Sequence, residues 1–115
     1  MLRITCSQYD LIEVLKILTD YDDILYTVHN ACSDKNAAFV YINDYDNEDV
    51  TDFYANMELC ILAMNQLVLD RLTEHVYVKI GDMTFVLDGQ EDVRDSAVNE
   101  LRKYENNLME EHKND

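Results

Sequence analysis

The segment from His75 to Asp88 restricts the fold more than any other part of the chain. Gly81-Asp82 suits a two-residue hairpin turn with glycine first. In that register the apolar pairs are Ile80 with Met83, Val78 with Phe85, and Val76 with Leu87. All six side chains then share one face, and the other face carries His75, Tyr77, Lys79, Thr84, Val86 and Asp88. The turn and the alternation therefore predict the same antiparallel hairpin.

Helical spacing of apolar residues predicts the elements around this hairpin. The predicted helices run over 7–19, 21–32, 48–74 and 90–109. The first is capped by Ser7, and the third is apolar around most of its circumference, which is typical of a central helix. The apolar, β-branched and aromatic run Ala37–Ile42 is predicted to be a strand, followed by a polar loop.

These elements indicate an α+β fold. We expect a small antiparallel or mixed sheet of three strands, or four if Leu2–Thr5 joins, with the helices packed on one face. The length of 115 residues and the apolar content of 48% suit a single domain over 1–115, with residues 110–115 frayed.

Composition narrows the classes of protein further. The 24 acidic and 9 basic residues give a net charge of −15, which disfavours direct binding to nucleic acid or to an anionic membrane. The three cysteines have no disulfide-framework spacing, and neither a signal peptide nor a membrane span is evident. We therefore expect a cytoplasmic protein.

Motifs for catalysis, cofactors or metals are not found. The two glycines exclude a glycine-rich phosphate loop, so we expect no enzyme and no cofactor. His29 and Cys32 share a face of the predicted second helix but lack further zinc ligands at suitable spacing. The loop 44–49 begins like a calcium loop, yet Asp49 and Ala55 stand where glycine and glutamate are needed.

The arrangement of charge is the feature left to explain. Between Ile17 and Asp70 the chain has eleven acidic residues and one basic residue, Lys35. Helix capping and loops explain some of these acids, but not the near-absence of lysine and arginine. We expect the acids from Asp20 to Asp52 to form a partner-binding patch, in which Tyr45 and Phe53 anchor the contact. The predicted patch comprises Asp20, Asp22, Asp23, Asp34, Asp44, Tyr45, Asp46, Glu48, Asp49, Asp52 and Phe53.

Such a patch can replace the phosphates of DNA in a basic cleft. In size, charge and tyrosine content the chain resembles DNA-mimic inhibitors of phage origin (anti-restriction or anti-CRISPR proteins) and the acidic immunity proteins of nuclease toxins. The resemblance implies an inhibitor whose partner is a basic nucleic-acid-binding enzyme or nuclease. The alternative is an interaction or assembly module that dimerises or binds through an apolar patch, and whose acidity serves solubility.

Overall fold

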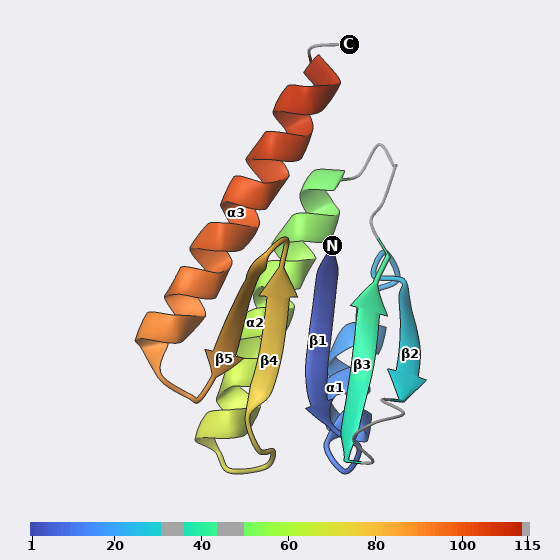
Figure 1. Ribbon diagram of the computed structural model, residues 1–115, viewed down its shortest axis with the longest axis vertical. Coiled ribbons are helices and arrows are strands. Elements are labelled where there is room, and N and C mark those ends of the chain that lie inside the picture. The colour runs from blue at the N-terminus through green and yellow to red at the C-terminus, as the bar shows by residue number, and fades with distance from the viewer. Residues whose placement is uncertain (31–35, 44–49, 114–115) are drawn as a thin grey trace.

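The computed structural model describes residues 1–30, 36–43 and 50–113. These residues form five strands and three helices (Figure 1). The elements are β1 (Leu2–Ser7), α1 (Leu11–Thr19), β2 (Tyr26–Asn30), β3 (Ala37–Ile42), α2 (Val50–Leu69), β4 (Val76–Ile80), β5 (Met83–Leu87) and α3 (Glu91–Lys113).

The strands form one antiparallel sheet in the order β2-β3-β1-β4-β5. The N-terminal strand β1 lies in the middle, between β3 and β4. The first six elements follow the split β-α-β-β-α-β arrangement, to which β5 and α3 are added. This arrangement occurs with many unrelated activities, so it carries no function by itself.

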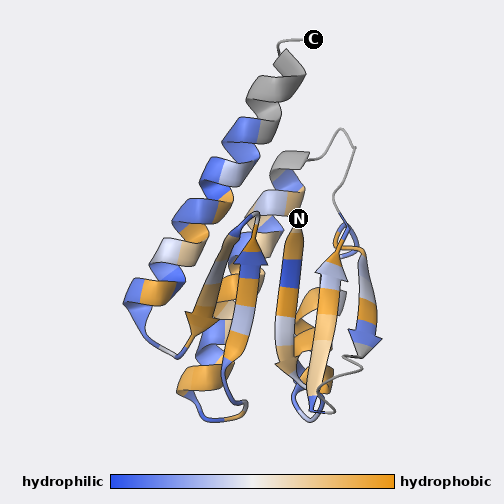
Figure 2. Ribbon diagram, in the orientation of Figure 1, coloured by the Kyte–Doolittle hydropathy of each residue, from blue (hydrophilic) through white to orange (hydrophobic). Residues whose placement is uncertain are grey.

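One face of the sheet is buried by the helices. Along β1 the buried residues are Leu2, Ile4 and Cys6, and the alternating burial continues on β3 and β4. These side chains join one core with the inner faces of α1, α2 and α3. Figure 2 shows hydrophobic residues concentrated on α1 and α2 behind the sheet, whereas α3 is largely hydrophilic. The expectation of an α+β fold with helices on one face of a sheet is confirmed.

The hairpin forms with the predicted register. Ile80 is opposite Met83, Val78 opposite Phe85, and Val76 opposite Leu87. Gly81 has a φ of 60°, the left-handed backbone for which glycine was expected in this turn.

The prediction of a second helix over 21–32 is wrong, and the sheet has five strands where three or four were expected. Residues Tyr26–Asn30 are strand β2, which pairs with β3 along its whole length. The spacing of Ile24, Leu25 and Val28 fits a helix, but pairing with the next strand, β3, overrides this local pattern. Leu2–Thr5, the optional fourth strand, belongs to β1.

Two helices are shorter than predicted. Helix α1 begins at Leu11, because Ser7 ends β1 and its Oγ accepts a hydrogen bond from the Asp10 N–H at 3.2 Å. Helix α2 ends at Leu69, and Arg71 follows with a φ of 60°, a left-handed conformation that a helix cannot continue through. Asp10 connects the start of α1 to the segment after α2, because its Oδ2 accepts a hydrogen bond from the Glu74 N–H at 3.0 Å.

The junction of β5 and α3 depends on a close backbone contact with α2. Gly89 has a φ of 89°, and a Cβ atom there would lie 2.9 Å from the Cα of Leu69. The buried Asn65 accepts the Gly89 N–H at 3.0 Å and donates to the Gln90 carbonyl at 3.4 Å. Only glycine therefore fits between α2 and the start of α3.

Within the described ranges, no helix combines the length and the apolar character that crossing a membrane requires.

We predict that Gly89→Ala lowers the free energy of unfolding by about 3 kcal/mol or more, because it adds a backbone overlap to the cost of a left-handed alanine. Gly81→Ala is the matched control. It has the same kind of backbone, but its added Cβ lies 3.8 Å from the Tyr104 ring, so the loss should be about 1 kcal/mol. Urea unfolding of the two variants measures the difference, and equal losses would contradict the contact with Leu69.

Candidate functional site

Four acids of the predicted patch lie around the N-terminal half of α2. Asp20, Asp22 and Asp23 belong to the link between α1 and β2. The Asn56 side-chain amide donates to both carboxylate oxygens of Asp23 at 3.0 Å, which joins this link to α2. Asp52 is exposed one helical turn before Asn56 and hence on the same side of the helix. We call Asp20, Asp22, Asp23 and Asp52 the acidic cluster.

The acidic cluster is not neutralised by the described part of the chain. The ion pairs found there join Lys16 to Glu13, Arg94 to Asp95 and Arg102 to Glu58. None of the four carboxylates takes part in an ion pair among these residues. Asp20, Asp22 and Asp52 are exposed, so their negative charge faces the solvent.

The other predicted binding residues have different outcomes. Asp34, Asp44, Tyr45, Asp46, Glu48 and Asp49 lie outside the described residues. Phe53 is only 1% exposed and belongs to the core, where its ring contacts that of Tyr54 edge-on at 5.1 Å between centroids. Its predicted role as an anchor for a partner is therefore wrong, because the buried ring is not available at the surface.

The described thiols are buried and protonated at neutral pH. Burial, with a smaller contribution from Asp10, raises the pKa of Cys6 from 9.0 to about 11. Burial, followed by the charges of Asp23 and Asp20, raises the pKa of Cys60 from 9.0 to about 12. Because the thiolate is the nucleophile and the metal ligand, neither thiol is activated for such chemistry.

The placement of His29 differs from the prediction. It lies on strand β2 and not on a helix, and its ring packs edge-on against Tyr41 at 5.2 Å. Cys32, its predicted neighbour, is outside the described residues. Within the described ranges no group of three or more histidine, cysteine, aspartate or glutamate side chains comes together for a metal ion.

The sheet has a second face, which none of the three described helices covers (Figure 1). We call it the open face. The register aligns its residues in two rows across the five strands: Thr27, Tyr41, Arg3, Lys79 and Thr84, then His29, Phe39, Thr5, Tyr77 and Val86. Among the residues of the described strands, none that points to this side is acidic. In a chain with 24 acids, the open face is thus distinct from the rest of the surface.

Two cations occupy the centre of the open face. Arg3 on β1 is directly opposite Lys79 on β4. The Arg3 guanidinium lies over the Phe39 ring at 4.9 Å from its centroid, which is a cation–π contact. The Arg3 Nε atom is buried and has no hydrogen-bond partner among the described residues.

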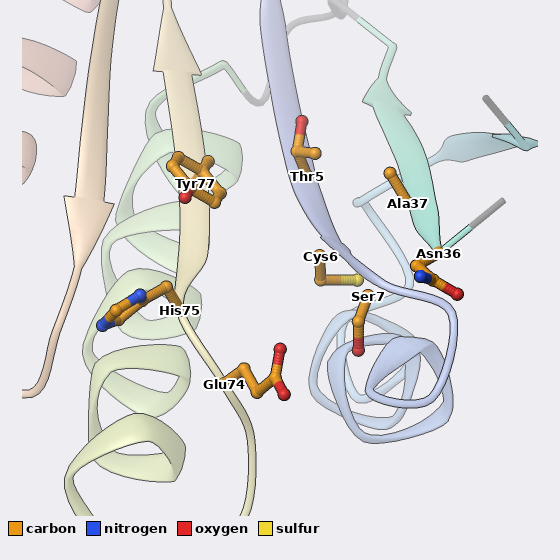
Figure 3. A pocket seen from close by; sticks show the side chains of 8 residues that line it. All are labelled: Thr5, Cys6, Ser7, Asn36, Ala37, Glu74, His75 and Tyr77. Carbon is orange, nitrogen blue, oxygen red and sulfur yellow. The ribbon is translucent and has the colours of Figure 1, made fainter. Parts of the chain in front are cut away.

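A shallow cavity of about 410 Å³ opens at one end of this face (Figure 3). It forms where the pairing of β1 with β4 ends at Thr5 and the two strands separate. Figure 3 shows Ser7 and Glu74 on opposite sides of this gap, with Thr5 and Tyr77 at the end nearer the sheet. The cavity is continuous with the open face, because Thr5 and Tyr77 belong to both.

The outward residues of the hairpin were predicted from the sequence, but the open face as a whole was not. The part of the open face that was not predicted lies on β1, β2 and β3. The alternation in Leu2–Ser7 was a signal for β1, and the helical reading of 21–32 concealed β2. Arg3 lies opposite Lys79 because β1 is the central strand, and no local sequence pattern specifies that position.

Comparison of the sequence with protein-family models and curated proteins, and of the fold with solved structures, gives no match.

We predict that the free energy of unfolding falls as the pH rises above 9. Folding raises the pKa of both thiols, so their contribution to stability is complete below pH 9 and is lost as the pH rises toward 11. The slope should reach about 1.4 kcal/mol per pH unit for each thiol. Urea unfolding between pH 8 and 10.5 measures it. Cys60→Ala should have a smaller slope than the parent chain, and equal slopes would contradict the shift at Cys60.

Proposed function

We propose that the chain is an acidic inhibitor that binds the basic, nucleic-acid-binding surface of another protein, through the acidic cluster. The observation that carries the proposal is the arrangement of charge. The acidic cluster gathers four carboxylates without ion pairs in the described residues, while the open face has none. Such a local group of carboxylates suits a cationic partner.

The physical basis is replacement of phosphates by carboxylates. A cleft that binds duplex DNA is built for about one negative charge per 1.7 Å of helix axis. Carboxylates held on a folded surface supply such charge without the cost of ordering a chain. Asn56 contributes by fixing the Asp23 carboxylate to α2 through two hydrogen bonds at 3.0 Å. Association of this kind is fast and weakens with salt.

We predict that Asp22→Lys with Asp52→Lys abolishes capture of a basic nucleic-acid-binding protein from bacterial lysate. Both side chains are exposed, so the fold should tolerate the change. Glu91→Lys with Asp92→Lys is the matched control, with the same change of charge in the first turn of α3. The bound protein should be released at high salt and displaced by DNA. Equal loss in both variants would contradict recognition through the acidic cluster.

A second candidate is an interaction or assembly module, which one observation favours. Helix α2 exposes three leucines at helical spacing, Leu59, Leu62 and Leu69, with exposures of 48%, 40% and 55%. An exposed apolar stripe is a feature of interaction sites. A partner retained at high salt, and lost with Leu59→Gln and Leu62→Gln, would support this module over the inhibitor.

A further inference from the structure

The open face has the composition of an interface. Aromatic residues and arginine are enriched at the centres of protein interfaces, and acidic residues are depleted there. The open face contains Phe39, Tyr41 and Tyr77, with Tyr77 40% exposed, and its strand residues include no acid. Solubility does not explain this exclusion, because an exposed sheet face is where charged side chains are easily accommodated.

The two central cations indicate the charge of the missing partner. Like charges directly opposite each other on neighbouring strands destabilise a sheet. Arg3 and Lys79 are so placed, and within the described residues neither forms an ion pair. The chain has only nine basic residues to place among 24 acids. An anionic group that bridges Arg3 and Lys79 would remove their repulsion and supply an acceptor for the guanidinium.

The seam between β1 and β4 defines the shape of the partner. Arg3 and Ser7 are four residues apart on β1, which corresponds to about 13 Å in a strand. The cations lie at one end of this seam, and the cavity beside Ser7 and Glu74 lies at the other. The Glu74 carboxylate makes that end an acceptor of hydrogen bonds. An extended segment about four residues long would reach from one end to the other.

Charge favours a protein segment over a nucleic acid or a second copy of this chain as the occupant of the open face. A single-stranded nucleic acid carries a charge on every nucleotide, and beyond the two cations it would meet Glu74 at the cavity and Asp88 after β5. A second copy stacked face to face would bring two Arg3 and two Lys79 side chains together without an anion, which is costly on burial. A segment with one or two carboxylates meets neither obstacle.

We propose that the open face binds an extended segment of another protein, which places one or two carboxylates against Arg3 and Lys79 and a hydrogen-bond donor at the cavity beside Glu74. This surface is distinct from the acidic cluster. It prefers an acidic partner, whereas the acidic cluster prefers a basic one. The inference does not depend on the inhibitor function, because the two surfaces have no residue in common.

The test uses a display library of random twelve-residue peptides selected on the full chain. Selected peptides should be enriched in aspartate and glutamate. Synthetic copies should bind Arg3→Gln/Lys79→Gln at least about ten-fold more weakly than the parent chain, since each charge-assisted hydrogen bond contributes on that scale. The matched control is Lys16→Gln/Lys103→Gln, which removes two exposed cations elsewhere and should change the dissociation constant by less than about two-fold. Urea unfolding of both variants checks that they are folded.

Three results would overturn the proposal. The first is selection of no peptide, or of peptides without acidic residues. The second is equal weakening in both variants, which would indicate a general effect of charge. The third is tighter binding of the oligonucleotides dT12 or U12, or self-association through this face in sedimentation experiments, which would assign it to nucleic acid or to a second copy.

Discussion

The central position of β1 is the constraint on which the rest of the structure depends. This strand pairs with β3 on one side and β4 on the other, so it joins two halves of the sheet that are far apart in sequence. Leu2, Ile4 and Cys6 on its inner side are buried against the helices. Its outer side places Arg3 and Thr5 at the centre of the open face. A single alternating strand thus contributes to the core and to the open face.

Local chemistry predicts those elements whose own residues carry a specific turn or strand signal. The hairpin follows from Gly81-Asp82 and the alternation beside it, and the strand Ala37–Ile42 from its β-branched and aromatic residues. Strand β2 is misread because its apolar spacing also fits a helix, and only pairing with β3 decides between them. Burial of Phe53 is not evident either, since α2 is apolar on several sides and its inward side depends on packing.

The composition of the surfaces, too, can be predicted only in part from the sequence. The eleven acids between Ile17 and Asp70 are visible in the sequence. The hydrogen bonds between Asn56 and Asp23, which join the link after α1 to α2, appear only in the fold. The open face is composed of residues from five strands, and its lack of acids appears only when the strands are aligned. The acidic cluster lies on one part of the molecule, and two cations without an ion pair among the described residues lie on another. This separation is the basis for assigning two different partners to a small chain.

The most direct test of this account is an NMR titration of the isotope-labelled chain with the basic protein that it captures from lysate. We predict that the amide signals of residues 20–23 and 52–56 shift or broaden, that those of Arg3, Tyr77 and Lys79 stay unchanged, and that high salt reverses the effect. Changes confined to the open face, or changes that persist at high salt, would contradict binding of a basic partner through the acidic cluster.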